Sequence, residues 1–574
     1  MKPKDGKEVD LTTGISDKEV ADKIKDIQRS FETGQVSRRS FMTGALAMGV
    51  SLTAASAILN KVEAATPKKG GRLRVGLTGG ATTDVLDPGQ ILDLYMIHLQ
   101  FGQLRNSLTE VAANGELTPE LAESWEASPD AKVWNFKIRK GVEFHNGKSL
   151  TSEDVVASIN HHLGENSKSA AKGIMDGVVS IKADGKHGVT VELSGGDADF
   201  PFLLTDYHMN ICPANSDGSI DWQSGIGTGG YVLQQHDAGV RSFTTRNPNY
   251  WKEGFAHFDE VEITQIADST ARSQALQGGS LDVINNVPTQ TVHLMKRVPG
   301  LKIEATTGNK QITLPMRTDT APFDNNDVRT AVKYIVDREE WLKKVVHGFG
   351  QLGNDSPVGP ANIYRATEAE LPQRQYDPDK AKFHLKKAGL SKLDIDFHAA
   401  ETGFGGALDA GQLMAASARA AGININVVRE PDDGYWSNVW MKKPFSACYW
   451  SGRATENWIF SQIYAADSSW NDTYWKHDKF NKLLVLARAE LDPDKRRILY
   501  VEMQQIVHHE GGVCLPLFRS DVMAYHERLH VPEVVGANWE LDGAKNSERW
   551  WFAWVDSSVK RLRGSIATPF FASK

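Results

Sequence analysis

Apolar and polar residues alternate over several short stretches of this chain, with the two-residue period of a β-strand. Residues 70–77 (GGRLRVGL) alternate in this way and predict a strand at the start of the globular region. Residues 134–139 alternate again, and residues 142–144 predict a second short strand close behind them. Residues 145–148 (HNGK) then predict a tight turn, with Gly147 at the strained position.

Helical patterns lie between the predicted strands. Residues 151–154 (TSED) have the capping sequence of a helix whose apolar face includes Val155 and Ile159. Residues 501–507 predict another helix, and residues 445–450 (FSACYW) predict a buried strand. Because helices and strands alternate to the C-terminus, we expect a mixed α/β fold.

The first 65 residues have the pattern of an export signal. Arg38 and Arg39 precede a moderately apolar run at 44–59, and small residues follow at Ala64 and Ala65. This order is typical of a cleaved signal peptide, and the arginine pair is typical of the twin-arginine pathway. The run of 16 residues is shorter than the roughly 20 that span a bilayer, so cleavage is favoured over a membrane anchor. We therefore expect a periplasmic mature protein.

Length and composition indicate the number of domains and exclude several classes of binding site. A chain of 574 residues is too long for one core, so two or three domains are expected. The net charge is 65 − 72 = −7 without a basic block, which argues against nucleic-acid binding. The three cysteines, Cys212, Cys448 and Cys514, include no C-x-x-C pair, so neither a disulfide framework nor a thiolate metal site is expected. Cys448 and Cys514 have apolar neighbours and are expected to be small buried residues.

A series of short motifs runs through nearly the whole mature chain. The motifs are PELAESWE (119–126), WNFKIRKGVEFHNG (134–147), LTSEDV (150–155), GTGGY (227–231), RNPNYW (246–251), ALQGG with LDV (275–283), PFD with VR (322–329), DRE (337–339) and YDPDKA (376–381). In residues and in order, this series resembles the family 5 extracellular solute-binding proteins, the dipeptide, oligopeptide and nickel binders of ABC importers.

The resemblance implies an α/β fold of the two-lobed periplasmic-binding-protein type, with an extra domain in the first lobe. Such a fold closes because the ligand's contacts stabilise the closed state over the open one. Most motif residues are expected to be structural: His145 belongs to the hairpin, and Gly227 and Gly229 are expected to set turns. The implied segments are the N-terminal extension and signal (1–64), the first lobe (65–108, 227–320 and 525–574), the extra domain (109–226) and the second lobe (321–524).

The candidate ligand site is the end of the predicted strand at 445–450. In the peptide binders of the family this position carries a Trp, a small residue, a Gly and then an Asp that pairs with the ligand's ammonium group. Trp450, Ser451 and Gly452 match, but Arg453 stands where the Asp is expected. An arginine repels an ammonium group and binds a carboxylate or phosphate through two parallel hydrogen bonds. We therefore expect a ligand with an anionic or hydrogen-bond-accepting group, such as an acidic or modified peptide, an opine-like compound or a sugar acid.

An internal alternative stays open, in which Arg453 pairs with Glu456 and the ligand meets neither. Glu456 is also a candidate partner for a cationic group of the ligand. Dipeptide binders carry an Arg near position 403 that holds the ligand's carboxylate, and residues 401–406 (ETGFGG) offer no such Arg. The aromatic residues considered as further ligand contacts are Trp450, Tyr95, Tyr207, Phe404 and Trp436.

The sequence leaves two alternatives to solute binding, an exported enzyme and a nickel or haem carrier. An exported enzyme lacks support, because the chain has neither the G-x-S-x-G motif of a hydrolase nor a P-loop motif. A nickel or haem carrier of the same fold is the second alternative, given 17 histidines, although these are scattered. We expect no cofactor, a small-molecule ligand, and a monomer that delivers it to the permease subunits of an ABC importer, with ATPase subunits behind them.

Overall fold

The computed structural model describes residues 67–432 and 434–553, so the predicted signal residues Arg38, Arg39, Ala64 and Ala65 lie outside the described part. The chain divides into two compact units. In the smaller unit, β18 (Leu529–His530) pairs with β19 (Trp551–Phe552) as an antiparallel ribbon. The larger unit, residues 71–526 and 532–549, contains every feature discussed below.

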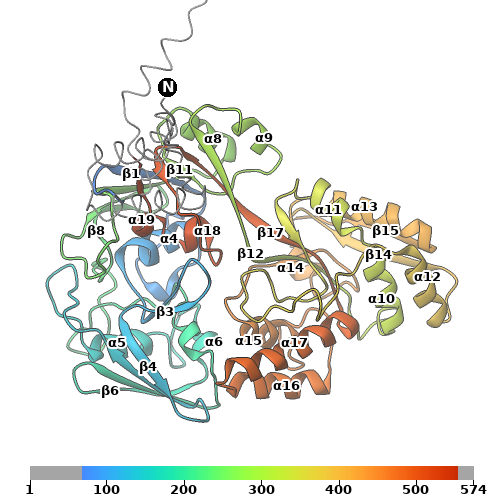
Figure 1. The fold of residues 1–574 in the computed structure, drawn as a ribbon, viewed down its shortest axis with the longest axis horizontal. Coiled ribbons are helices and arrows are strands. Elements are labelled where there is room, and N and C mark those ends of the chain that lie inside the picture. Colours follow the sequence, from blue (N-terminus) through green and yellow to red (C-terminus); the bar gives the residue numbers. More distant parts are fainter. Residues whose placement is uncertain (1–66, 433, 554–574) are drawn as a thin grey trace, which may run out of the picture. The chain divides into compact units, whose positions relative to one another are not determined.

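A nine-stranded mixed sheet forms the centre of the larger unit (Figure 1). The predicted strand at 70–77 is present as β1, which pairs in parallel with β10 and β11. The strands, in spatial order, are β16 (Cys448–Trp450), β12 (Leu301–Pro315), β17 (Val513–His526), β11 (Val283–Ile284), β1 (Arg72–Leu77), β10 (Glu260–Gln265), β9 (Arg241–Arg246) and β8 (Tyr231–Asp237), with β13 (Gly350–Leu352) on β17.

The long antiparallel strands β12 and β17 connect two hydrophobic cores (Figure 1). At one end, Val522 and Ala524 of β17 belong to a core with Leu276. At the other end, Ile312 and Leu314 of β12 belong to a separate core of 30 buried residues. Between these ends the pairing shifts register at Thr307/Gln311, a local irregularity in the ladder.

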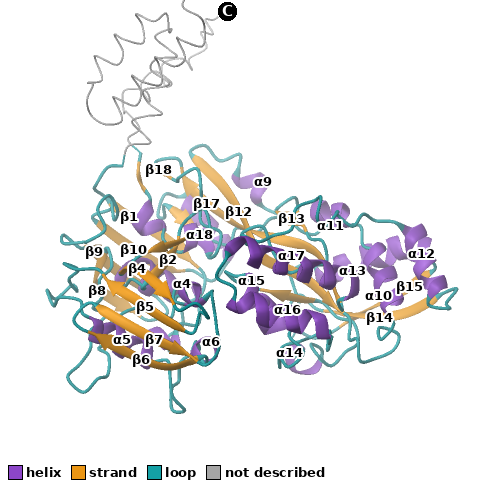
Figure 2. Ribbon diagram, turned by 60° about the horizontal axis from the view of Figure 1, so that its bottom comes forward, coloured by secondary structure: helices purple, strands orange, loops and turns teal. Residues whose placement is uncertain are grey.

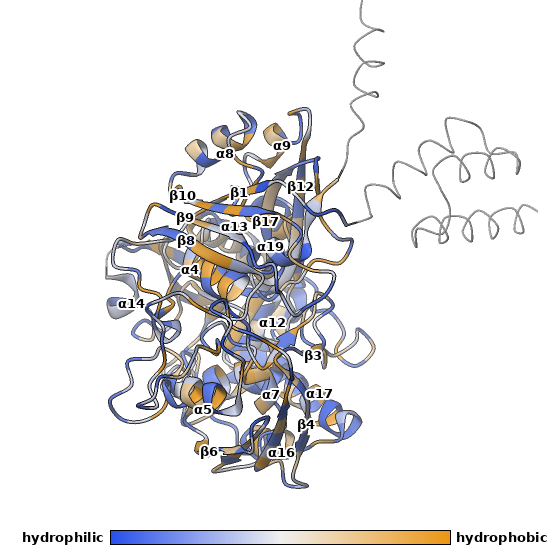
Figure 3. Ribbon diagram, turned by 90° about the vertical axis from the view of Figure 1, so that its left-hand side faces the viewer, coloured by the Kyte–Doolittle hydropathy of each residue, from blue (hydrophilic) through white to orange (hydrophobic). Residues whose placement is uncertain are grey.

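A four-stranded antiparallel sheet, β4 (Ala122–Ala127), β5 (Val133–Ile138), β7 (Gly188–Leu193) and β6 (Val178–Asp184), carries α5 (Ser152–Asn160). The predicted capping sequence is confirmed, because Thr151 and Asp154 form a capping box. Figure 3 shows hydrophilic and hydrophobic residues around α5, whose buried Val155 and Ile159 join the core of this sheet. The second short strand predicted at 142–144 is wrong: only an isolated bridge joins Glu143 to Ser149.

Parallel strands β14 (Leu393–Ala399) and β15 (Ile423–Arg429) and the helices around them form the 30-residue core. Figure 2 shows α16 and α17 side by side, and the helix predicted at 501–507 lies within α17. The strand predicted at 445–450 is present as bridges at Phe445 and Ser446 followed by β16.

The longer helices are α5, α8 (Ser269–Gln277), α10 (Asn326–Tyr334), α11 (Arg338–Lys344), α12 (Pro378–Lys387), α13 (Ala407–Ala418), α16 (Asp478–Ala489) and α17 (Pro493–Glu510). The remaining described α-helices and β-strands are α4 (Leu94–Leu99), α6 (Lys172–Met175), α7 (Phe200–Leu203), α9 (Val292–Met295), α14 (Tyr435–Asn438), α15 (Glu456–Ile459), α18 (Glu540–Gly543), α19 (Asn546–Arg549), β2 (Thr109–Val111) and β3 (Leu117–Pro119).

Gly227 and Gly229 serve close packing rather than the turns predicted for them. Neither glycine has a positive φ angle. A Cβ atom at Gly227 would lie 2.1 Å from the carbonyl oxygen of Leu104, and one at Gly229 would lie 2.2 Å from that of Gln103. Both glycines therefore allow two backbone segments to touch. His145 is structural as expected, since its ring lies 3.0 Å (Nε2) from the carbonyl oxygen of Gly229 and its Nδ1 accepts from the N–H of Gly227.

Cys448 and Cys514 are buried as predicted, and Cys212 is buried as well. Within residues 67–432 and 434–553, no helix combines the length and apolar character that a membrane crossing requires. The segment boundaries expected for the lobes and the extra domain stay a prediction.

Candidate functional site

Two adjoining cavities lie in the larger unit. The inner cavity has a volume of about 30 Å³ and is lined by residues 101, 110–112, 205–206, 309–310, 452–454, 458, 536–539, 543 and 545. The outer cavity is more open and has a volume of about 840 Å³. Segments that contribute to its lining include residues 91–92, 170–178, 193–208, 451–470 and 488. Four residues line both cavities: Asp206, Arg453, Trp458 and Trp539.

Arg453 lies at the junction of the cavities, in the loop after β16. Its Nε donates to Gln462 at 2.6 Å, and its Nη1 donates to the carbonyl oxygens of Ser451 and Gly452 at 2.8 and 3.1 Å. Its guanidinium carbon lies 5.5 Å from the ring centroid of Trp458. Nη2 has no hydrogen-bond partner in the part of the chain that the structure describes. Burial lowers the pKa of Arg453, and the negative charge of Asp206 opposes this effect.

The loop that carries Arg453 is fixed by polar contacts to its backbone. The side-chain amides of Asn309, on β12, and Asn362 donate to the carbonyl oxygen of Arg453 at 2.9 and 3.2 Å. A Cβ atom at Gly452 would lie 2.6 Å from the Cβ atom of Asn309, so a larger residue would push the loop off the strand. The position of the guanidinium group is therefore set by the central sheet.

The neighbours of Arg453 in sequence have different roles. Ser451 lines the outer cavity and Gly452 lines the inner one. Trp450 is 7% exposed, lines neither cavity, and donates its indole N–H to Asp472 at 3.2 Å. Burial raises the pKa of Asp472 to about 6, although hydrogen bonds from two indoles act in the opposite direction.

Glu456 does not form the alternative pair with Arg453. It is 1% exposed and accepts the backbone N–H of Tyr364 at 2.7 Å. Burial raises the pKa of Glu456 to about 7, because the ionised carboxylate is separated from water. Arg453 donates to Gln462 instead.

Of the four other aromatic residues considered, Tyr207 is the one that the structure places at a cavity. It lines the outer cavity and packs edge-to-face on Trp539 at 5.0 Å. Tyr95 is fully buried with its hydroxyl 2.7 Å from that of Ser242. Phe404 belongs to the 30-residue core, and Trp436 is 39% exposed on α14. These last three line neither cavity.

Several cavity residues had no signal in the sequence. Asp206, Trp458 and Trp539 lie in three segments that are distant in sequence, and no motif marks them. Glu110 and Lys545 also line the inner cavity without belonging to any recognised pattern.

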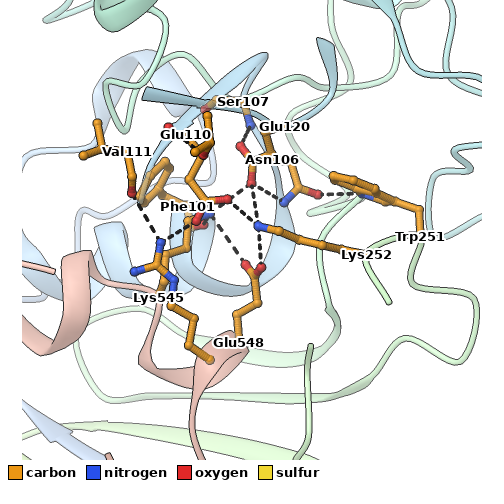
Figure 4. A network of polar contacts seen from close by, with 12 residues as sticks. Phe101, Asn106, Ser107, Glu110, Val111, Glu120, Trp251, Lys252, Lys545 and Glu548 are labelled. Atoms are coloured by element: carbon orange, nitrogen blue, oxygen red, sulfur yellow. Dashed lines mark hydrogen bonds and ion pairs between the residues drawn. The ribbon is translucent and has the colours of Figure 1, made fainter. Parts of the chain in front are cut away.

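A network of buried charges neutralises one wall of the inner cavity (Figure 4). Lys252 forms ion pairs with Glu110 and, at 2.7 Å, with Glu548. Lys545 is 3.4 Å from Glu120 and donates to the carbonyl oxygen of Phe101 at 3.1 Å. Burial raises the pKa of Glu120, and Lys545 counteracts the increase.

Lys310, another charged residue that lines the inner cavity, also has ion-pair partners. Lys310 lies 2.5 Å from Asp521 and 3.1 Å from Glu540. Burial lowers the pKa of Lys310, but these carboxylates outweigh it, so the pKa lies above its ordinary value. Lys310, Lys545 and Glu110 therefore have protein partners, in contrast to Nη2 of Arg453.

Comparison with known proteins shows to which family the chain belongs. Residues 116–472 match the model of the bacterial extracellular solute-binding proteins, family 5. The chain belongs to this family. It is therefore the substrate-binding protein of an ABC importer, and the relatives it matches are solute-binding proteins rather than enzymes.

Individual relatives differ in the solutes that their names report. The chain is 25% identical to heme-binding protein A of Haemophilus influenzae over 474 residues, which covers 74% of this chain and 83% of the relative. It is also 25% identical to the oligopeptide-binding protein OppA of Bacillus subtilis over 464 residues, 74% of this chain and 84% of the relative. These names agree on the kind of protein and disagree on the solute.

Solved structures of the family confirm the fold. HbpA2 from Haemophilus parasuis superimposes with a TM-score of 0.72 at 20% identity, covering 80% of this chain and 96% of that one. The predicted class, an α/β two-lobed fold of the periplasmic-binding-protein type, is confirmed. Family 5 binding proteins are periplasmic or extracellular.

Proposed function

We propose that this solute-binding protein captures a peptide or an amino-acid-derived solute through an anionic group that binds Arg453, and delivers it as a monomer to its permease. The observation that carries the proposal is Nη2 of Arg453, which has no partner among the residues that the structure describes and lies on a hydrogen-bonded loop at the junction of two cavities. A partly buried guanidinium group with free N–H donors binds a carboxylate more strongly than a fully solvated one does. The outer cavity, with a volume of about 840 Å³, provides the room for a solute.

Replacing Arg453 by glutamine is expected to abolish binding of the anionic solute. Loss of one partner from a buried, hydrogen-bonded charge pair costs about 2–5 kcal/mol, which is roughly thirtyfold or more in affinity. A thermal-shift screen of residues 65–574 against peptides, opines, amino-acid conjugates and sugar acids identifies the solute, and calorimetric titration measures the loss. At 100 times its dissociation constant a ligand stabilises the protein by about 2.7 kcal/mol, which the screen detects.

The matched control is Arg365→Gln. Arg365 is also an arginine whose pKa burial lowers, and it lies over an aromatic ring, Phe518, at 5.6 Å, but it lines neither of the two cavities. The control should keep full affinity for the solute. Equal affinities of the Arg453→Gln variant and the unaltered protein would remove Arg453 from the site.

The alternative of a metal or haem carrier has no comparable support in the described residues. Residues 67–432 and 434–553 contain no group of three or more His, Cys, Asp or Glu side chains placed to hold a metal ion. His208 lines the outer cavity, but both of its ring nitrogens have neighbours within hydrogen-bonding distance. Metal analysis and an absorbance spectrum of the purified protein would reveal such a ligand.

We also propose export by the twin-arginine pathway, with cleavage before Ala65. Replacing both Arg38 and Arg39 by lysine is expected to keep the protein in the cytoplasm, because the pathway recognises the arginine pair. Cell fractionation measures the distribution, and N-terminal sequencing of the exported protein locates the cleavage site. Unchanged export of the double-lysine variant would show that another route is used.

A further inference from the structure

The junction between the cavities carries two charges of opposite sign. Among the four residues that line both cavities, Arg453 is the cation and Asp206 is the anion. They form no direct ion pair in the described chain, since Arg453 donates to Gln462 and to two carbonyl oxygens, while Asp206 contacts His208. Two opposite charges at one opening, each with a free atom, are typical of a site for a ligand that carries both signs.

Asp206 is a buried carboxylate with one oxygen unused. The residue is 4% exposed. Its Oδ1 accepts the backbone N–H of His208 at 2.9 Å and lies 2.5 Å from Nδ1 of the same histidine. Its Oδ2 has no hydrogen-bond partner within residues 67–432 and 434–553. A carboxylate oxygen at a cavity that accepts no hydrogen bond from the described chain is available to a ligand's donor.

His208 holds one oxygen of Asp206 in place. Its Nδ1 lies 2.5 Å from Oδ1 of Asp206, and its Nε2 lies 2.9 Å from the carbonyl oxygen of Ile91. These contacts engage Oδ1, so Oδ2 is the oxygen of Asp206 that has no partner in the described chain.

Aromatic rings complete the junction. Trp458 lies against the guanidinium of Arg453, and Trp539 packs on Tyr207, the residue after Asp206. Both indoles line both cavities. They place apolar surface beside the two charges, which lowers the local dielectric constant and strengthens the interaction of each with an opposite charge.

We infer that Asp206 is a specificity-determining residue and that the solute is a zwitterion. Its carboxylate binds Nη2 of Arg453 and its ammonium group binds Oδ2 of Asp206. This assignment rests on the proposed function, since it requires the anionic group at Arg453. It reverses the polarity of the peptide-binder pattern, in which the residue at the position of Arg453 is an aspartate that binds the ammonium group. Here the acidic partner comes from a segment almost 250 residues earlier in the chain.

The test uses three zwitterions of increasing charge separation: phenylalanine, Ala-Phe and Ala-Ala-Phe. Each is compared with its N-acetyl form, which lacks the ammonium group, and with its C-terminal amide, which lacks the carboxylate. Calorimetric titration measures binding to the unaltered protein and to Asp206→Asn, Arg453→Gln and Asp87→Asn. Asp87 is the matched control, because it is another buried aspartate bound to a histidine, His161, at 2.7 Å, and it lines neither cavity.

At least one zwitterion is expected to bind at least tenfold more tightly than both of its modified forms. Asp206→Asn should reduce the affinity for that zwitterion to the level of its N-acetyl form, while leaving the N-acetyl form unaffected. Arg453→Gln should reduce the affinity for the zwitterion to the level of its amide. Asp87→Asn should leave the affinity of the zwitterion relative to its N-acetyl form, and relative to its amide, unchanged. Circular dichroism and the melting temperature without ligand show that each variant is folded.

Two results would overturn the assignment of Asp206 alone. They are equal affinities for a zwitterion and its N-acetyl form, and a preference for the zwitterion that survives Asp206→Asn. If Arg453→Gln still weakens the binding of the compounds with a free carboxylate in either case, the proposed function stands. Amides that bind as tightly as the acids would overturn the proposed function itself, and binding by none of the three zwitterions would overturn the inference.

Discussion

Replacing Asp355 by asparagine is expected to lower the free energy of unfolding by about 3–5 kcal/mol. Asp355 is fully buried between two arginines. Its Oδ1 accepts from Nη2 of Arg338 at 2.7 Å and from the backbone N–H of Leu515 at 2.9 Å, and its Oδ2 accepts from Nε of Arg374 at 2.7 Å. Asparagine fills the same volume and tolerates the φ angle of 53° at this position, so the variant isolates the charge. Without it, two buried guanidinium groups repel one another.

The effect has a defined pH dependence. Burial by itself would raise the pKa of Asp355, but Arg338 and Arg374 outweigh it, so the pKa lies far below its ordinary value. A lowered pKa in the folded state means that the stabilisation is complete above the unfolded pKa of about 3.9 and is lost as the pH falls below it. The difference between the unaltered protein and the variant should therefore be full at pH 7 and smaller at pH 3.

Denaturant titration at the two pH values measures this difference. Asp319→Asn is the control, since Asp319 pairs with Arg317 at 2.8 Å at the surface, where an ion pair contributes about 1 kcal/mol or less. A loss below 1 kcal/mol for Asp355→Asn at pH 7 would contradict the prediction.

Replacing Lys545 by methionine is expected to destabilise the protein by a similar amount, about 3–5 kcal/mol. Lys545 is 1% exposed, and its ammonium group lies 3.4 Å from Glu120 and 4.1 Å from the ring centroid of Phe101 (Figure 4). Methionine retains the length of the side chain but leaves Glu120 without this cation. Burial already raises the pKa of Glu120, and loss of Lys545 raises it further.

A raised carboxyl pKa means that the folded variant takes up a proton more readily than the unfolded chain. Its stability should therefore improve as the pH falls, and the loss relative to the unaltered protein should be smaller at pH 5 than at pH 8. Denaturant titration at both values measures this. Lys137→Met, which removes an exposed lysine paired with Glu123, should have little effect at either pH. An equal loss at pH 5 and pH 8 would assign the effect to packing alone.

Much of the fold follows from short-range patterns. The capping box at Thr151 and Asp154 and the strand β1 depend on residues close in sequence, and both were predicted correctly. The strand predicted at 142–144 failed, because pairing also requires a partner and the neighbouring backbone offers one bridge only. The role of Gly227 could not be read locally either, since the contact it permits is with Leu104, more than 120 residues earlier.

The sequence likewise predicted some residues of the candidate site and missed others. Arg453 could be identified because it replaces a single residue in a motif that is otherwise intact. Tyr95 and Phe404 were as plausible as Tyr207 on sequence alone, and the structure buries both of them away from the cavities. Asp206 had no signal, because its importance depends on one free oxygen beside a distant arginine.

The sequence by itself determined the family, the mixed α/β class and the position of the arginine, since each depends on the order of residues along the chain. Only the tertiary structure decided which charges are free to meet a solute. Lys310, Lys545 and Arg453 all line the inner cavity, and remote carboxylates pair with the two lysines. Nη2 of Arg453, by contrast, meets no acceptor in the described residues. A charge is available for binding when its surroundings fail to satisfy it, and those surroundings are assembled by folding.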